Sequence, residues 1–250
     1  MCARGRMRPI SDALAEHFEV FNYDRRGRGD SGDTVPYSVE REIEDLRALI
    51  DEAGGRAHLY GHSSGAVLAL RAAAAGVPVD RLVAHDPPFT PNPGGDPARV
   101  RYSTELERSL ADAGRGDAVE LFMGLTGMPA EVIAAMRESP AWPGFEAIAP
   151  TLSYDSQVMG DRDCGGAIPI AMLERLRVPL LVLAGGAVDD WMKRAGALVA
   201  EHVSDGRYEE IPGAGHAVQP EAYASMVVEF FAWHDAERDA AEAASPDFAA

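Results

Sequence analysis

The sequence has few cysteines and little positive charge. Its 250 residues include two cysteines, Cys2 and Cys164, which are too few for the disulfide framework of a small secreted protein. Lys and Arg number 23 against 40 Asp and Glu, giving a formal net charge of −17. Such an excess of acidic groups would repel a phosphate backbone. The composition therefore argues against a nucleic-acid-binding protein.

Long hydrophobic runs are also lacking. No apolar run approaches the roughly 20 residues that a transmembrane helix requires. Arg4, Arg6 and Arg8 lie near the N-terminus, but the apolar core of a signal peptide does not follow them. Hydrophobic residues make up 46% and charged residues 25%, as in ordinary globular proteins. We therefore expect a cytoplasmic protein without membrane contacts, with one large domain or two small ones.

Short apolar runs alternate with amphipathic segments along most of the chain. Strands are expected at Phe18–Tyr23, His58–Tyr60, Leu82–His85, Val178–Ala184 and Arg207–Ile211. Helices are expected at Ile10–His17, Val39–Ala53, Ala66–Ala75, near Trp191–His202 and from Glu221 to about Ala240. Such alternation is typical of an α/β fold, with a mostly parallel β-sheet flanked by helices. The C-terminal tail Ala236–Ala250 is expected to fray.

This alternation stops between Thr90 and Ile170, where Pro and Gly interrupt helical segments and no strand is evident. The helical segments are Tyr102–Ala113, Asp117–Leu125 and Ala130–Glu138. We predict that residues 1–89 and 171–250 form the α/β core and that 90–170 is a helical cap. The cap is rich in large apolar side chains: Phe122, Met123, Met128, Met136, Trp142, Phe145 and Met159. They either line an acyl pocket or pack the interior of the cap.

Gly61-His62-Ser63-Ser64-Gly65 matches the Gly-x-Ser-x-Gly pattern between a predicted strand and a predicted helix. A sharp turn in this context exposes the serine hydroxyl as a nucleophile. We expect both glycines to be required, because a side chain at either position would collide with neighbouring backbone. A glycine-rich turn with an incidental serine is the alternative interpretation.

A serine hydroxyl needs a base to become a good nucleophile. Of seven histidines, only His216 lies in a glycine-rich loop, after the last predicted strand and before the last helix. His17, His202 and His234 lie on or at the ends of predicted helices, where solvated or capping roles are expected. His58 and His62 are four residues apart but on a strand and a turn, which argues against a metal site.

Three landmarks in order carry a family resemblance: the stretch from Tyr23 to Gly32, the turn at Ser63 and the loop at His216. With them, the chain resembles the α/β-hydrolase family. The resemblance implies Ser63 as nucleophile, His216 as general base and the backbone N–H of Ser64 as an oxyanion donor. It also implies that no metal or organic cofactor is needed.

Two positions compete for the acid of the triad that the resemblance implies. Most of the family carry it after the penultimate strand, where Asp189 or Asp190 would serve, although the spacing from Gly185 differs by one residue. Some relatives carry it one strand earlier, where Asp86 is followed by two prolines that would fix the carboxylate. We favour Asp86. Asp189 has a simpler reading as the N-cap of the following helix.

The chain departs from the family at its N-terminus. Members have strands before the first helix, and the loop after one of them supplies a second oxyanion N–H. This chain reaches its first predicted helix almost at once, so we expect these strands to be missing. One sheet edge would then be unpaired, and the lost donor would cost about 10²–10³ in rate.

The resulting hypothesis is a serine hydrolase that cleaves an ester-like bond in a small apolar substrate through an acyl-enzyme. One alternative is a catalytically silent binding protein with the same fold. A second is a dinucleotide-dependent oxidoreductase, because Gly27–Gly32 also reads Gly-x-Gly-x-x-Gly. That fingerprint requires an acidic residue at the end of the next strand, which this sequence lacks. The substrate and the oligomeric state stay open.

Overall fold

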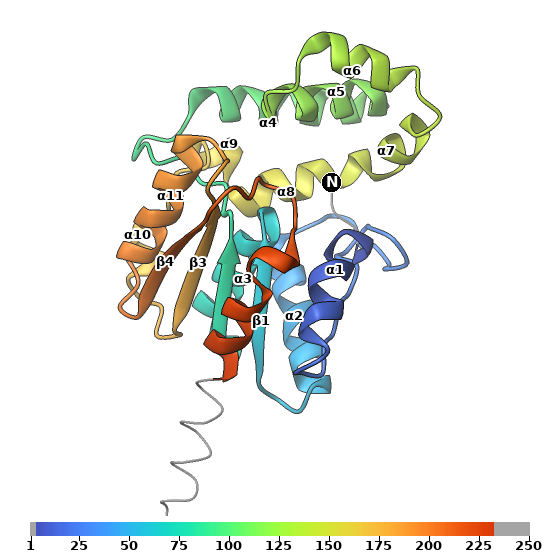
Figure 1. The fold of residues 1–250 in the computed structure, drawn as a ribbon. Coiled ribbons are helices and arrows are strands. Elements are labelled where there is room, and N and C mark those ends of the chain that lie inside the picture. Colours follow the sequence, from blue (N-terminus) through green and yellow to red (C-terminus); the bar gives the residue numbers. More distant parts are fainter. Residues whose placement is uncertain (1–3, 233–250) are drawn as a thin grey trace, which may run out of the picture.

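The computed structural model describes residues 4–232 (Figure 1). Cys2, His234 and the tail expected to fray lie outside these residues. Four parallel strands form one sheet in the order β1-β2-β3-β4. They are β1 (Ala57–His62), β2 (Val79–His85), β3 (Leu180–Gly185) and β4 (Gly206–Ile211). The predicted α/β class, with a parallel sheet flanked by helices, is confirmed.

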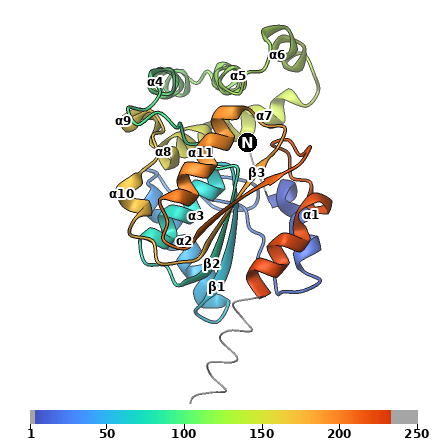
Figure 2. The same cartoon turned by 60° about the vertical axis from the view of Figure 1, so that its left-hand side comes forward.

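Helices cover both faces of the sheet (Figure 2). They are α1 (Arg4–Leu14), α2 (Val39–Glu52), α3 (Ser64–Ala74) and α11 (Asp190–Glu201), and residues 224–232 are also helical after the short 3-10 turn η2 (Pro220–Ala222). Side chains alternate between the faces of a strand. Leu82 and Val182 pack with α2, α3 and α11, whereas Val83 and Leu183 pack with α1 and the helix at 224–232.

The segment between β2 and β3 is helical and lies over the carboxyl ends of the strands (Figure 1). It contains α4 (Pro97–Ala111), α5 (Arg115–Leu125), α6 (Ala130–Arg137), α7 (Trp142–Ile148), the 3-10 turn η1 (Ala149–Thr151), α8 (Leu152–Met159), α9 (Asp161–Cys164) and α10 (Ile170–Leu173). Its two ends meet at a β-bridge between Thr90 and Ala167. Six of its seven large apolar side chains named above pack in one cluster, and Met159 joins the main core. Packing therefore accounts for them better than an acyl pocket does.

The predicted strand at Phe18–Tyr23 is wrong. These residues have no regular secondary structure and pair with no strand of the described chain. Strand β1 is an edge strand of the described sheet, and no hydrogen-bond ladder forms beyond it within residues 4–232. An extended segment becomes a strand only when a neighbour satisfies its backbone groups. Here Phe18 and Val20 instead pack on the core beneath α1.

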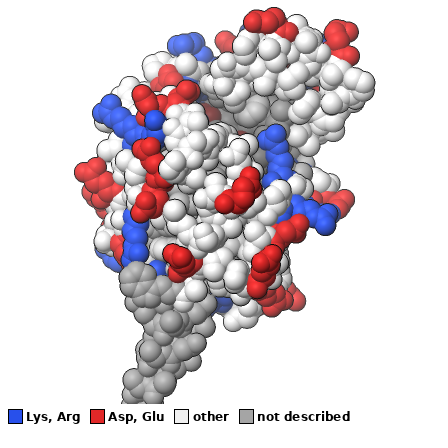
Figure 3. Space-filling model, in the orientation of Figure 1, with Lys and Arg blue, Asp and Glu red and all other residues white. Residues whose placement is uncertain are grey.

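The first helix also differs from its prediction. It begins at Arg4, the first described residue, rather than at Ile10, so the described chain has no strand ahead of it. Within residues 4–232, no helix has the length and apolar character needed to cross a bilayer. On the face shown in Figure 3, acidic and basic side chains lie next to one another rather than in a patch of one sign.

Candidate active site

The turn between β1 and α3 holds Ser63 in a strained conformation. Its backbone has φ 55° and ψ −126°, a region that residues other than glycine rarely occupy. The Ser63 N–H donates to the carbonyl oxygen of His85 at 2.9 Å, which fixes the turn to the end of β2. A strained residue held by its neighbours is typical of functional sites.

The two glycines of this turn are not equivalent. A Cβ on Gly61 would lie 2.4 Å from the carbonyl oxygen of Gly65 and 2.7 Å from the Cα of Ala66. A Cβ on Gly65 would meet no atom within 4 Å. The expectation that both glycines are sterically required is therefore wrong for Gly65, because that residue lies in the first turn of α3 and the position of its Cβ is open.

Three side chains predicted from the sequence form a hydrogen-bonded row at the carboxyl end of the sheet. The Nε2 atom of His216 lies 3.2 Å from the Oγ of Ser63, and its Nδ1 lies 3.0 Å from the Oδ2 of Asp86. Because a carboxylate can only accept, Nδ1 carries the proton and Nε2 is left to accept from the hydroxyl. The second carboxylate oxygen accepts from the Gly185 N–H at 3.0 Å.

Asp86 is fully buried and has φ 47°. Burial alone would raise the pKa of its carboxyl group. The hydrogen bond from His216, the proximity of His85 and the Gly185 N–H outweigh burial, so the pKa lies below its usual value. The carboxylate is therefore ionised at neutral pH.

The other acid candidate, Asp189, lies apart from this row. It is exposed and occupies the N-cap of α11, but its side chain makes no capping hydrogen bond. Its carboxylate instead accepts from the Nε1 of Trp191 at 3.3 Å. The structure thus brings Asp86, and not Asp189, to His216.

His62 is a member of the site that the sequence did not reveal. Its Nε2 lies 2.8 Å from the backbone carbonyl oxygen of His216, so this nitrogen carries the proton and donates. Burial lowers the pKa of His62 to about 3, with further lowering from His216 and His85, so the ring is neutral at pH 7. The hydrogen bond anchors the loop that carries His216. In the sequence, the adjacency of His62 to Ser63 was the one indication that His62 belongs to the site.

Loss of this anchor is expected to slow the reaction of Ser63. Replacing His62 with Phe keeps a planar ring but removes the donor, and a small shift of His216 would then lower the rate roughly 10–100-fold. His62→Gln, whose amide can donate at a similar position, is the matched control and should retain most of the rate. The rate of covalent labelling by a fluorophosphonate measures both. Full reactivity in a folded His62→Phe variant would contradict this role.

An ion-pair network joins the turn to the cap. The guanidinium of Arg25 donates to the Oγ of Ser64 at 3.1 Å, to both carboxylate oxygens of Glu42 at 2.6 Å and to Asp155 of α8 at 3.0 Å. Burial alone would lower the pKa of Arg25, but the bond to Glu42 and the two acidic charges raise it. Arg25 therefore stays charged beside Ser64.

Asp155 also accepts from Arg28 at 2.8 Å. Burial would raise its pKa, but Arg28 and Arg25 hold it well below the usual range. Both arginines belong to the stretch from Tyr23 to Gly32, which the sequence marked as a family landmark without indicating these partners. The network connects α2, α8 and the turn at Ser63 with fixed charges.

The donor atoms of His62, Asp86 and His216 lie within 4.8 Å of one another, so the three could approach a metal ion. Their hydrogen bonds assign them differently. A cation bound by His216 Nδ1 and Asp86 would have to displace the proton of the hydrogen bond that joins these two side chains. We therefore interpret His216 and Asp86 as members of the hydrogen-bonded row, and His62 as the anchor of the loop that carries His216.

The glycine-rich segment Gly27–Gly32 lacks the structure of a dinucleotide site. Its ends are joined by a hydrogen bond from Gly27 N–H to the Gly32 oxygen at 3.0 Å, and α2 begins only at Val39. A dinucleotide fingerprint needs a strand directly before the glycines and a helix directly after them. The oxidoreductase alternative is therefore wrong on this point.

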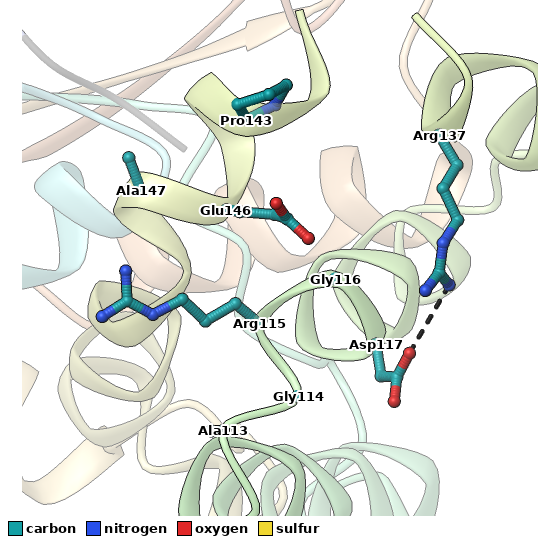
Figure 4. Close-up of a pocket in the computed structure, with 9 residues that line it drawn as sticks. All are labelled: Ala113, Gly114, Arg115, Gly116, Asp117, Arg137, Pro143, Glu146 and Ala147. Atoms are coloured by element: carbon teal, nitrogen blue, oxygen red, sulfur yellow. Dashed lines mark hydrogen bonds and ion pairs between the residues drawn. The ribbon is translucent and has the colours of Figure 1, made fainter.

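The cap carries two surface hollows that are separate from the row at Ser63. One has a volume of about 540 Å³ and includes Arg115, Asp117, Arg137 and Glu146 in its lining (Figure 4). The second, of about 890 Å³, lies among α4, α5 and α6. None of the lining residues belongs to the hydrogen-bonded row, and Arg137 already pairs with Asp117 at 3.5 Å.

The family profile and a solved structure of a similar protein both point to the alpha/beta hydrolases. The sequence profile of the alpha/beta hydrolase family matches residues 3–228. A crystal structure of an alpha/beta hydrolase from Sphaerobacter thermophilus is 46% identical, with a TM-score of 0.82, covering 92% of this chain and 88% of that one.

Two curated proteins are also similar. A protein assigned the name carbamate hydrolase RutD, from Azorhizobium caulinodans, is 27% identical over 90% of this chain and 86% of its own length. N-formylmaleamate deformylase from Pseudomonas putida is 33% identical over 118 residues. That alignment spans 45% of this chain and less than half, 44%, of the deformylase.

Proposed function

This chain belongs to the alpha/beta hydrolase family, and we propose that it is a serine hydrolase that cleaves an ester-like bond through a covalent acyl-enzyme. One observation carries the proposal: the hydrogen-bonded row Ser63–His216–Asp86, with 3.2 Å and 3.0 Å between successive groups. A nucleophile within reach of a base, and a base oriented by a third group, define the arrangement needed for acyl transfer.

In the proposed first step, the Oγ of Ser63 attacks the substrate carbonyl carbon while His216 Nε2 takes the hydroxyl proton. Asp86 keeps the Nδ1 proton in place and stabilises the imidazolium that forms. The carbonyl oxygen becomes an oxyanion. Ser64 is the first residue of α3, and the N–H groups of a helix's first turn have no intrahelical partner. Its backbone N–H is therefore suited to bind the oxyanion.

Collapse of the tetrahedral intermediate breaks the bond to the leaving group, which receives the proton from His216 Nε2. Water then attacks the acyl-enzyme, with His216 again accepting a proton. The carboxylic acid leaves, and the proton returns to Ser63. Each step needs only protons that the row can hold, so the atoms balance with water as the one co-reactant.

A small amide or carbamate is the second candidate substrate class. Two relatives are named as an N-formylmaleamate deformylase and a carbamate hydrolase, and in N-formyl compounds and carbamates the carbonyl carbon is bonded to nitrogen. The same row would serve, since His216 can protonate an amine as well as an alkoxide. Screening matched ester, amide and carbamate probes would separate the classes.

Labelling with a fluorophosphonate, followed by intact-mass measurement, tests the proposal. We expect one adduct on the wild type and none on Ser63→Ala, because only an activated serine attacks phosphorus at a useful rate. No adduct on a folded, monodisperse wild type would overturn the proposal and favour a silent binding protein.

A further inference from the structure

A second row of polar side chains ends next to Asp86, with Tyr223 and His85 buried and Tyr60 partly buried. The hydroxyl of Tyr223 is 3.1 Å from the hydroxyl of Tyr60, which is 2.6 Å from the Nδ1 of His85. His85 is completely buried at the end of β2, directly before Asp86. Its other ring nitrogen, Nε2, has no hydrogen-bond partner and lies 3.8 Å from the Oδ2 of Asp86.

The direction of these hydrogen bonds follows from the charge of Asp86. If His85 carried its proton on Nδ1, the lone pair of Nε2 would face an ionised carboxylate in a buried site, which is repulsive. If the proton is on Nε2, the positively polarised end of the ring lies 3.8 Å from Oδ2 and stabilises the carboxylate. Tyr60 then donates to Nδ1, and because its single proton is used there, Tyr223 donates to Tyr60.

His85 acts as a dipole rather than a cation. Burial lowers its pKa to about 4, although the charge of Asp86 opposes this and His216 adds to it. The other titratable groups facing it are Tyr60, Tyr223 and His62, whose ring centre is 5.0 Å away. Both tyrosines have raised pKa values, chiefly through burial, and His62 is neutral as described above. Apart from His216 itself, no titratable group that faces His85 within the described residues therefore supplies a positive charge in place of its N–H.

We propose that His85 is a positioning residue, whose Nε2–H, aimed by Tyr60 and Tyr223, stabilises the Asp86 carboxylate and thereby sets the basicity of His216. The inference rests on the proposed function, since it assigns His216 as the base. At 3.8 Å the contact is too long for a hydrogen bond, so it leaves Oδ2 available to His216. The effect of the His85 Nε2–H is to reduce the negative electrostatic potential that Asp86 exerts on His216.

This role predicts a shift in pH dependence. Without the His85 N–H, Asp86 presents more negative potential to His216, and the protonated imidazole is favoured. The acid limb of the labelling rate against pH therefore moves to higher pH. A variant that only loosens packing would lower the rate at every pH without moving the limb.

The test compares His85→Phe, which removes the N–H but keeps a ring, with His85→Gln, whose amide can replace it. We expect the acid limb of fluorophosphonate labelling to move up by about half a pH unit or more in His85→Phe, and to stay near wild type in His85→Gln. Tyr60→Phe should move it in the same direction, because Nδ1 loses its donor. An unmoved limb in folded His85→Phe overturns the role of His85.

A measurement on the wild type keeps the inference testable if the variants fail to fold. Nitrogen-15 NMR of the imidazole rings distinguishes the two neutral tautomers, and we expect His85 protonated on Nε2. Protonation on Nδ1 overturns the inference. Failure of the proposed function would look different, because the wild type would then not be labelled at all, whatever the His85 tautomer.

Discussion

Replacing Asp86 with asparagine is expected to lower the rate of acyl transfer by about four orders of magnitude. The amide cannot hold Nδ1–H of His216 as a carboxylate does, because its own N–H₂ favours the opposite tautomer. It also carries no charge to stabilise the imidazolium. The side chain keeps its size, so the buried site should retain its shape.

Asp189→Asn is the matched control. Its carboxylate is exposed and bonds only to Trp191 among the described contacts, so the rate should stay within about twofold of wild type. Fluorophosphonate labelling and the turnover of a chromogenic ester measure both variants. A large loss in Asp189→Asn, with Asp86→Asn unaffected, would reverse the assignment. Small and equal losses of rate in the two variants would contradict the assignment of either residue as the acid of the triad.

Replacing Gly61 with alanine is expected to destabilise the fold strongly. The new methyl group would lie 2.4–2.7 Å from backbone atoms of Gly65 and Ala66. Because this backbone is held between β1 and α3, moving it away would cost considerable free energy. Overpacking of this kind costs about 3 kcal/mol. For a chain of this length that lowers Tm by roughly 6–12 °C. Displacement of Ser63 should also abolish labelling.

Gly65→Ala in the same turn is the control. Its Cβ would point into open space at the start of α3, and alanine favours helix more than glycine does. We expect Tm to stay within about 2 °C of wild type and labelling to persist. Thermal unfolding followed by circular dichroism measures both variants. Equal Tm values for the two would show that the turn is softer than its geometry implies.

The sequence predicted those parts of the fold that depend on local pattern. Strands β1 to β4 and the helices between them follow apolar periodicity, and they appear close to the expected positions. Phe18–Tyr23 has the same pattern, but strand formation also requires a neighbour in space. Whether such a neighbour is present depends on the topology of the whole sheet, and the sequence of the segment itself does not indicate it.

The candidate site divides in a similar way. The sequence predicted that Ser63, His216 and Asp86 lie together, because each of them follows a strand, and a motif and the order along the chain indicate such positions. The same signal fits both Asp86 and Asp189, because both follow strands. His62 and His85 were missed because a histidine's role depends on which carbonyl or carboxylate its ring meets. The partner of His62 is the carbonyl group of His216, more than a hundred positions away along the chain. The partner of His85 is the carboxylate of the next residue, Asp86, and their contact depends on the folded backbone.

The meeting of the two cap ends at Thr90 and Ala167 has a consequence for protein engineering. Since both ends leave the core at one place, residues 91–166 form a cassette, and we expect that its exchange would leave the strand order of the sheet unchanged. A replacement would have to restore the contacts that Val158 and Met159 make with the main core, and a second condition concerns charge. Arg25 and Arg28 stay in the core and both donate to Asp155 of the cassette, and removing one member of a buried ion-pair network is strongly destabilising. A replacement cassette must therefore bring its own carboxylate to that point.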